Sequence, residues 1–429
     1  MKNQFTTLLL FLFILNAYSQ DTTNQYRINY YNQKVIKYLD REKMLFNYYK
    51  IDKEGIKIYA TPAHKANDSV EYKIKWEQLT EFNVCIREGK TASYFSSKKH
   101  GSIQSTAIKA NTESSYNHLK PLSGLKIAID PGHMAGDFET GKLEMKSLQF
   151  KKDSINGLPD SIKIAEGMLT YATASLLKEK LEADGASVFL TRQKNGYTAF
   201  GKTFDDWLKD DYKNKVEELH KSGKLSTDKK NLMLSSKFTK RNKFLFFKDI
   251  ELAERADIIN AFNPDFTVII HFNVDETNTG WKAPGQKNYN MTFIGGAFMP
   301  GDLSSPEKRL EFLRMIATND IEESILLSGA VTQQFETVLK VKTAGPTDAK
   351  YLREGCLTTE KKGVYCRNLQ LTRYIHGPLV YGETLYQDNI NECKALNKES
   401  DKMKNERIKE VAKAYYQGIY DYITTKNIN

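Results

Sequence analysis

The feature that most constrains the fold is a short apolar run that ends abruptly on a turn and a histidine. Residues 127–129 are apolar, and Asp130-Pro-Gly-His133 follows them directly. So short an apolar run between turn residues is typical of a strand that is buried on both faces. The proline removes a ladder donor and the glycine frees the backbone, so the chain must leave the sheet there. We therefore expect His133 at the carboxyl end of a strand, where open α/β sheets bind ligands.

The same design recurs later in the chain. Residues 266–270 form a second apolar run, which ends on His271. Between the two runs, apolar residues recur at helical spacing over residues 164–183, and residues 186–191 have the pattern of another buried strand. Strand, helix and strand in this order predict a βαβ unit with parallel strands.

The rest of this region shows weaker patterns. We expect, in chain order, a long polar loop over 134–161, a helix over 249–262, an edge strand over 288–297, a helix beginning at Ser305-Pro306, a less regular stretch over 330–375, a short final strand over 379–381 and a closing amphipathic helix.

The amino-terminal residues have the features of a secretory signal. An apolar core at residues 8–15 follows one positive charge, and Ala17-Tyr-Ser19 has the small-x-small pattern of a cleavage site. We interpret residues 1–19 as a signal peptide and expect an exported protein, periplasmic or extracellular. No later stretch is long and apolar enough to predict a transmembrane segment.

Residues 20–118 form an amino-terminal accessory region of unknown role, and the main domain is expected to span 119–429. The accessory pattern predicts a helix near 35–49 and strands over 55–60, 70–76 and 81–86, followed by a polar linker at 98–123. Two arrangements remain open for this region: a small separate domain, or an extension that packs on the main domain.

The charge balance is basic, with 63 Lys and Arg against 53 Asp and Glu. This excess could favour an anionic polymer, but the lysines are spread along the chain and no arginine-rich patch marks a nucleic-acid surface, so we expect no nucleic-acid partner. The 4 cysteines contain no Cys-x-x-Cys, which argues against a thiolate metal site. Export permits disulfides, and Cys356 with Cys366 is the most plausible pair.

Four side chains that can carry chemistry converge in this topology. His133, His271 and Glu383 follow strand ends, and Glu166 opens a helix. Taken singly, Glu166 could be a favourable charge at a helix start, Glu383 a surface carboxylate and His271 a core residue. Together they favour a metal site, because two imidazoles and one carboxylate are the usual ligands of a hydrolytic zinc. A further carboxylate, free of the metal, can accept the proton of a water molecule.

The ordered motifs resemble the zinc-dependent N-acetylmuramoyl-L-alanine amidases, cell-wall hydrolases with a type 3 amidase catalytic domain. The matching pieces are Ile127-Ala-Ile-Asp-Pro-Gly-His133, Glu166, Gly185-Ala-Ser-Val-Phe-Leu-Thr-Arg192, Leu252-Ala-Glu-Arg255 with Asn260, Val268-Ile-Ile-His271-Phe-Asn273, and Pro378-Leu-Val-Tyr-Gly-Glu383-Thr384 with Asn389. They span about residues 125–425, and such an ordered set is far more specific than any single motif.

The resemblance implies an α/β fold: a mixed, mainly parallel sheet sandwiched by helices, of the phosphorylase/hydrolase-like kind. It implies Zn²⁺ held by His133, Glu166 and His271, with Glu383 as the general base. The implied substrate is peptidoglycan or its muropeptide fragments, cut at the amide between N-acetylmuramic acid and L-alanine. Asn273 and Arg373 are weaker candidates for positioning groups.

Three positions and one insertion depart from the family pattern. Leu385 stands where the family usually has glycine, and Tyr381-Gly382 replaces an apolar pair. The lysine-rich, helix-prone residues 193–248 fall where relatives often carry a segment that covers the zinc until a partner displaces it. An autoinhibitory insert with an activating protein partner is therefore one hypothesis, and a solvated charged excursion is the other.

Two other function classes compete with the amidase. A zinc peptidase or another amidohydrolase on the same fold would cut peptides that lack a sugar. A non-catalytic wall-binding regulator would need the fold but not Glu383, so the presence of all four site residues argues against it.

Overall fold

A computed structural model describes residues 24–428 except for 91–93, 96–119, 152–160, 279 and 281–282. The expected signal peptide and most of the expected linker lie outside the described residues. Among the described residues, no helix combines the length and the apolar character needed to cross a bilayer.

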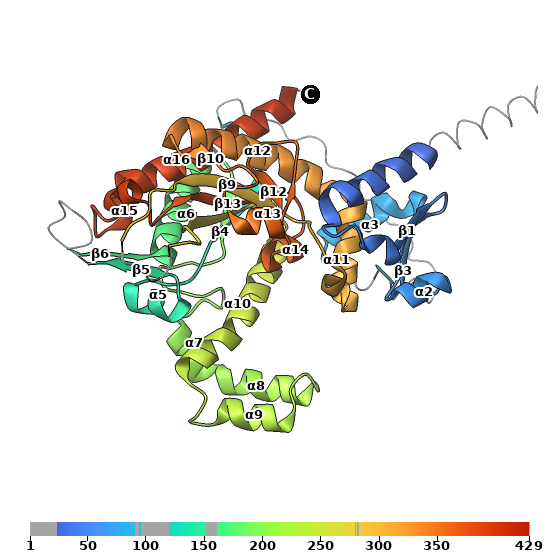
Figure 1. The fold of residues 1–429 in the computed structure, drawn as a ribbon, viewed down its shortest axis with the longest axis horizontal. Coiled ribbons are helices and arrows are strands. Elements are labelled where there is room, and N and C mark those ends of the chain that lie inside the picture. The colour runs from blue at the N-terminus through green and yellow to red at the C-terminus, as the bar shows by residue number, and fades with distance from the viewer. Residues whose placement is uncertain are drawn as a thin grey trace, which may run out of the picture.

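The main domain is built on an 8-stranded sheet that is mixed and mainly parallel, as expected (Figure 1). Its strand order is β11-β12-β9-β13-β8-β4-β7, and β10 pairs with β9 outside this path. Only the pairs β9–β13 and β11–β12 are antiparallel among the described strands of this sheet. The strands are β4 (Lys126–Pro131), β7 (Ser187–Leu190), β8 (Phe266–Asn273), β9 (Tyr289–Ile294), β10 (Lys342–Thr343), β11 (Leu357–Thr358), β12 (Val364–Cys366) and β13 (Leu379–Tyr386).

Helices cover both faces of this sheet, which confirms the expected sandwich. Ile127 and Ile129 of β4 pack in one apolar core with α6 (Glu166–Ala183), α12 (Asp320–Leu339) and α16 (Glu406–Ile428). Ala128, between them, faces the opposite core with α10 (Lys240–Phe262) and α14 (Gln370–Tyr374). The alternation follows from strand geometry, in which successive side chains point to opposite faces. This is why an uninterrupted apolar run was the right signal for the strand.

Several expected elements of the main domain are corrected. The stretch predicted to be a loop contains α5 (Phe138–Glu144) and β5 (Ser147–Phe150), and β5 forms a hairpin with β6 (Ile162–Ala165). Its polar sequence hid a short helix that the Asp137 side chain caps by accepting from Thr140 N. The predicted edge strand is β9, which lies inside the sheet between β12 and β13. The final strand is longer than expected and central, because it pairs with both β8 and β9.

The stretch expected to be less regular includes the end of α12, α13 (Lys350–Gly355) and α14. The expected helices on either side of this stretch are present: α11 (Pro306–Ala317), capped by Ser305, precedes it, and the closing helix α16 follows it. A short helix, α15 (Ile390–Leu396), and a 3-10 turn, η6 (Lys402–Lys404), connect β13 to α16. All 4 cysteines, Cys356 and Cys366 included, are free thiols in the structure.

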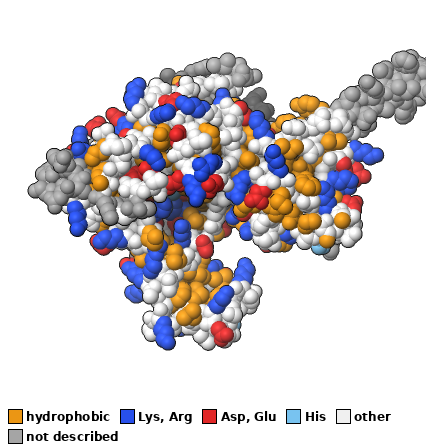
Figure 2. Space-filling model, in the orientation of Figure 1, with side chains coloured by type: hydrophobic (Ala, Val, Ile, Leu, Met, Phe, Trp, Pro, Cys, Tyr) orange, Lys and Arg blue, Asp and Glu red, His pale blue; other side chains and the backbone are white. Residues whose placement is uncertain are grey.

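From Phe204 onward the insert is mainly helical, and it extends away from the sheet at the bottom of Figure 1 and Figure 2. It comprises α7 (Phe204–Asp210), α8 (Tyr212–Lys221), α9 (Thr227–Leu234) and the first part of α10. Its own core is aromatic, with Phe204, Trp207, Phe244 and Phe247 buried together. Helix α10 begins at 240 rather than 249, so one continuous helix joins this core to the sheet.

The amino-terminal region packs directly on the main domain, at the right of Figure 1. Its residues share one apolar core with Ile294, Phe298 and Phe312, the last of these from α11. The strand predicted over 81–86 is instead helix α3, because Phe82 and Ile86 are four residues apart and both buried. The predicted helix near 35–49 is mostly wrong: the chain is helical from 24 to 39 and then forms a 3-10 turn and a strand.

The described elements of this region are η1 (Val35–Leu39), η2 (Leu45–Asn47), β1 (Tyr49–Asp52), β2 (Gly55–Ile58), α2 (Pro62–Ala66), β3 (Tyr72–Lys75), η3 (Trp76–Gln78) and α3 (Leu79–Arg87). Strands β1, β2 and β3 form a separate antiparallel sheet in that order. A 3-10 turn of the main domain, η5 (Pro300–Leu303), also contributes to the shared core through Leu303.

Candidate metal and catalytic site

His133 lies just past the end of β4 in a left-handed backbone conformation, with φ at 60°. The glycine before it allows this approach to a neighbouring strand. A Cβ on Gly132 would lie 2.2 Å from Cε1 of His271, which no real contact permits. The turn after β4 therefore needs glycine because the His271 ring from β8 occupies the space beside it.

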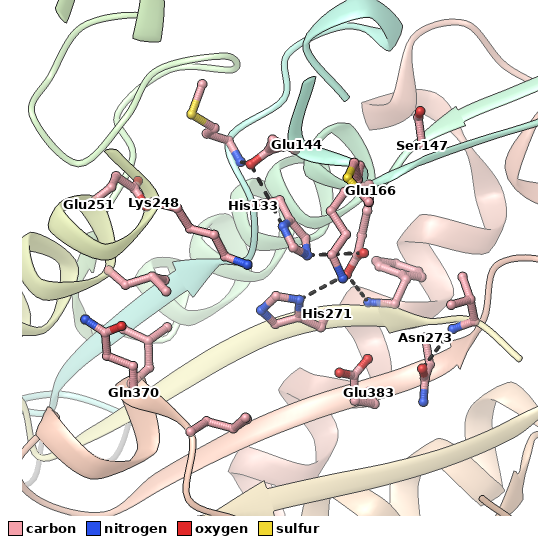
Figure 3. Close-up of a pocket in the computed structure, with 18 of the residues that line it drawn as sticks. His133, Glu144, Ser147, Glu166, Lys248, Glu251, His271, Asn273, Gln370 and Glu383 are labelled. Carbon is pink, nitrogen blue, oxygen red and sulfur yellow. Dashed lines mark hydrogen bonds and ion pairs between the residues drawn. The ribbon is translucent and has the colours of Figure 1, made fainter. Parts of the chain in front are cut away.

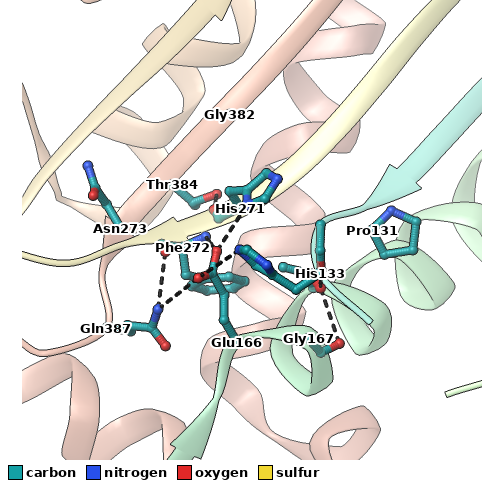
Figure 4. Close-up of polar contacts among 12 residues, drawn as sticks. Pro131, His133, Glu166, Gly167, His271, Phe272, Asn273, Gly382, Thr384 and Gln387 are labelled. Carbon is teal, nitrogen blue, oxygen red and sulfur yellow. Dashed lines mark hydrogen bonds and ion pairs between the residues drawn. The ribbon is translucent and has the colours of Figure 1, made fainter. Parts of the chain in front are cut away.

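Glu166 is the first residue of α6 and lies between the two imidazoles (Figure 3). Its Oε2 is 3.2 Å from His133 Nε2, and its Oε1 is 3.0 Å from His271 Nδ1. The backbone N of Phe272 donates to the same Oε1 at 3.1 Å. Gln387 Nε2 lies 3.4 Å from Oε2 and donates to the Phe272 carbonyl at 3.1 Å (Figure 4). The carboxylate is thus held in place from three sides.

The electrostatics of the group suit metal binding. Burial lowers the pKa of His133 to about 3, so its imidazole is neutral and able to ligate at ordinary pH. Burial disfavours the charge of Glu166, but the neighbouring His133 and His271 keep the pKa of this carboxyl well below its usual value. His133 Nε2 is buried without a geometrically acceptable hydrogen bond.

One ligand atom from each of His133, Glu166 and His271 lies within 4.8 Å of the others. A bound cation would be held by two imidazole nitrogens and one carboxylate, and it would satisfy the orphaned Nε2 of His133. The residues present therefore fit a metal ion of the zinc type.

Glu383 lies beside this group but not in it. On β13 it is the register partner of His271 on the parallel strand β8, so both side chains lie on the same face of the sheet. Burial raises the pKa of Glu383 to about 7, against the opposing effect of His271. A carboxyl group with this pKa, next to a metal-binding group and lining the same cavity, has the properties of a general base.

A buried arginine supports the backbone of the His133 turn. Arg255 Nη2 donates to the His133 carbonyl at 3.0 Å, and Nη1 donates to the Pro131 carbonyl at 3.0 Å and to Asp130 Oδ1 at 3.1 Å. Its Nε donates to Glu251 Oε1 at 2.8 Å. The sequence contained Arg255 in a family motif, but its partner carbonyls could not be identified without the fold.

Removing this arginine is expected to destabilise the protein strongly. Asp130 has 0% and Arg255 1% of its side chain exposed, so Arg255→Met leaves a buried carboxylate without its partner. Breaking a buried pair in this way costs about 3–5 kcal/mol. Urea unfolding should show this loss, whereas Lys240→Met, which removes an exposed ion pair with Asp205, should change stability by about 1 kcal/mol or less. An equally small loss for both variants would contradict the supporting role.

Glu144 is a further buried carboxyl group that the sequence did not reveal. It accepts from the backbone N of Met134 and of Ala135, both at 2.9 Å, and its Oε1 lies 3.9 Å from His133 Nδ1. Burial raises its pKa to about 7. Glu144 thus fixes the residues after His133 and faces the ring nitrogen that points away from Glu166. It belongs to α5, within the stretch that had the pattern of a loop, so no sequence signal singled it out.

The two suggested positioning residues lie in different places. Asn273 lines the cavity, where its Nδ2 donates to Tyr351 Oη at 2.7 Å. Arg373 is not among the cavity-lining residues, and its Nη1 donates to Asn368 Oδ1 at 3.0 Å. The structure therefore brings Asn273 to the site and leaves Arg373 outside it.

The positions that depart from the family pattern are explained by packing. The Tyr381 ring stacks on His271, with centroids 4.5 Å apart and planes 2° from parallel. A Cβ at Gly382 would lie 2.1 Å from Tyr415 Oη, so only glycine fits there. Leu385 is fully buried in the core beneath the sheet. None of the three blocks the cavity, and Tyr381 restrains the orientation of one of the two imidazoles.

The cavity that contains these groups has a volume of about 320 Å³. Its walls come from the ends of β4, β8 and β13, from the segment between α5 and β5, and from α10 and α14. The insert contributes Phe244, Phe247 and Lys248 of α10, and no residue of its helices α7, α8 or α9 lines the cavity. The part of the insert that extends from the domain therefore leaves the site uncovered.

The fold and site together describe a mixed α/β domain whose sheet carries, at its strand ends, a group able to bind a metal ion. Residues 127–421 match the family model described as N-acetylmuramoyl-L-alanine amidase. The chain therefore belongs to the N-acetylmuramoyl-L-alanine amidase family, enzymes that act on peptidoglycan. The resemblance drawn from the sequence motifs is confirmed. No curated protein is similar enough in sequence to count as a relative.

Solved structures of amidases show low sequence identity to this chain. The CwlD amidase of Clostridioides difficile, solved in complex with the GerS lipoprotein, is 18% identical, with 70% of this chain and 99% of that chain covered and a TM-score of 0.39. Apo Ami1 of Mycobacterium abscessus is 15% identical, with 70% and 99% covered and a TM-score of 0.36. The CwlV catalytic domain of Bacillus (Paenibacillus) polymyxa var. colistinus is 14% identical, with 70% and 98% covered and a TM-score of 0.36.

Proposed function

We propose that this protein is a zinc-dependent amidase that hydrolyses the bond between N-acetylmuramic acid and L-alanine in peptidoglycan. The observation that carries the proposal is the convergence of His133, Glu166 and His271 within 4.8 Å, with Glu383 beside them on the neighbouring strand. Family membership supports the amide bond as the target.

In this proposal His133, Glu166 and His271 hold zinc. Glu383 transfers protons. A bound zinc ion supplies Lewis acidity, polarising the scissile carbonyl and lowering the pKa of an attacking water. Glu383 accepts the proton of that water and returns it to the amine of L-alanine as the bond breaks. Burial raises its pKa, to about 7 in the metal-free protein, and a raised pKa suits both transfers because the group can gain and lose a proton near neutral pH. Asn273, in the same cavity, is proposed to orient the substrate.

The proposed organisation of the chain follows from this function. Residues 1–19 direct export to the periplasm or the extracellular space, where peptidoglycan is found. Residues 119–429 form the catalytic domain with its insert at 193–248, and residues 20–118 form the amino-terminal region.

Mass spectrometry of muropeptide digests tests the proposed function. Purified protein with zinc should release stem peptides that begin with a free L-alanine amine and leave saccharides that carry an intact lactyl carboxylate. A chelator should stop the reaction, and added zinc should restore it. Cleavage of peptides that lack a sugar would favour the zinc peptidase instead. Cleavage that persists in chelator, or saturable binding of muropeptides without any cleavage, would refute the proposal.

We also propose that an activating protein acts on the insert. Because α10 continues from the aromatic core of the insert to the cavity wall, displacement of α7–α9 would be transmitted to Phe244 and Phe247. Helices α8 and α9 form the outer part of the insert, here called the arm (residues 212–234), and line none of the cavity.

Replacing residues 212–234 with a short glycine-serine linker tests whether the arm restrains the enzyme. If it does, basal activity on purified cell wall should rise several-fold, and any response to an activator should be lost. Unchanged or lower activity in a folded deletion variant would show that the insert is a solvent-exposed charged segment and not an inhibitory one. Circular dichroism and the zinc content of the variant provide the control for folding.

A further inference from the structure

Most of the charged groups in the cavity wall have partners. Arg255 is paired with Glu251, and Glu166 contacts both histidines. The exceptions among the cations are Lys146 and Lys248, which line the cavity but form no side-chain hydrogen bond or ion pair with any described residue. Both are solvent-exposed, as cations at the entrance of a cavity are.

Lys248 reaches the site from the insert. It follows Phe247, whose buried ring fixes this turn of α10 in the aromatic core. Figure 3 shows its side chain extending from α10 toward the space beside His133 and His271. An extended lysine that approaches a metal-binding group without a carboxylate partner leaves its charge available to a ligand.

Lys146 reaches the site from the opposite wall. Its backbone is fixed at both ends, because its N donates to the Gly141 carbonyl at 2.9 Å and its carbonyl accepts from Glu166 N at 3.0 Å. Like Lys248, it lines the cavity that holds His133, Glu166 and Glu383. The two lysines therefore flank the proposed reaction centre.

The chemistry that two separated ammonium groups recognise is a chain with carboxylates. A peptide that enters such a cavity would place its acidic groups near the lysines by charge-assisted hydrogen bonding. Stem peptides of peptidoglycan are of this kind, because the residue after L-alanine is a glutamate derivative whose α-carboxylate is either free or amidated.

We propose that Lys146 and Lys248 bind carboxylates of the stem peptide and make the enzyme selective for acidic over amidated peptides. This inference rests on the proposed amidase function and adds the feature of the substrate that is recognised. It also gives the insert a direct role in substrate binding, because Lys248 lies on the part of α10 that the insert contributes.

The test compares two substrates that differ only at this α-carboxylate: the γ-methyl ester of N-acetylmuramoyl-L-alanyl-D-glutamate and the γ-methyl ester of its D-isoglutamine counterpart. The wild-type enzyme should show a lower KM for the acid. Lys248→Met and Lys146→Met should each raise the KM for the acid by about 5- to 10-fold, with little effect on the KM for the amide and a change in kcat below about twofold. Lys248→Arg should retain most of the preference.

Lys142→Met is the matched control, because Lys142 is an exposed lysine of α5 that pairs with Glu139 and does not line the cavity. It should leave both KM values unchanged. Equal KM values for acid and amide in the wild type, or equal changes for both substrates in the variants, would overturn the inference.

A binding measurement separates this inference from the proposed function. The peptide L-alanyl-D-glutamate can be titrated into the zinc-loaded protein and followed by NMR. Binding that weakens about 10-fold or more in the Lys146→Met/Lys248→Met double variant supports the lysine pair even if the wild type cleaves neither substrate. Binding that is the same in the wild type and the double variant would refute the pair even in an active enzyme.

Discussion

Replacing Glu383 with glutamine is expected to lower the rate of amide cleavage by about 10²- to 10⁴-fold, the usual contribution of a general base. Glutamine keeps the size and shape of the side chain but cannot accept the proton. Glu383 is not one of the three clustered groups, so zinc content should stay at the wild-type level. The measurements are kcat/KM on a soluble muropeptide and zinc by atomic absorption.

The pH profile supplies the control for this variant. The base must be deprotonated to act, and burial raises the pKa of Glu383 to about 7 in the metal-free protein. A nearby zinc ion lowers that value, so the wild-type kcat/KM should rise with pH along a limb centred at or below about pH 7. The residual activity of Glu383→Gln should lack this limb. Full activity, or an unchanged profile, would assign the base to another residue.

Replacing His133 with alanine is expected to weaken zinc binding on the order of 10³-fold. Binding free energies of roughly 10–16 kcal/mol at protein zinc sites, shared among a few ligands, make each ligand worth several kcal/mol. The strand should persist, because residues 127–129 are buried independently of the histidine. Competition with a chromophoric chelator measures the affinity, and near-ultraviolet circular dichroism reports the fold.

His64→Ala is the control for this substitution, because His64 lies in α2 of the amino-terminal region and is exposed. It should bind zinc as the wild type does. A folded His133→Ala protein that binds zinc with full affinity would show that the metal site has been placed on the wrong residues.

The parts of the fold that were predictable are those whose residues are buried on both sides. Residues 127–129 and 266–270 are apolar because helices cover both faces of the sheet, and their histidines follow where the strands end. Glu383 could be placed for the same reason, since the apolar residues before it form a central strand. These local patterns depend little on distant parts of the chain.

The parts that could not be predicted depend on long-range partners. The helix α5 has 7 residues and mostly polar side chains, so its periodicity is too short to detect, and Glu144 was missed with it. The interior position of β9 depends on pairing with β12 and β13, which are 70 or more residues away. The same holds for Phe82 and Ile86 of α3, whose burial against the main domain determines the helix.

The left-handed conformation of His133 has a consequence for how the site acquires its metal. For a residue other than glycine such a backbone is disfavoured by roughly 1–2 kcal/mol, and the guanidinium of Arg255 holds the carbonyl that follows. This cost is met when the chain folds, before any cation arrives. The site is therefore preorganised in its main chain. Zinc capture should then require adjustment of side chains alone, and the apo and zinc-loaded proteins should show the same amide hydrogen exchange along β4 and β8.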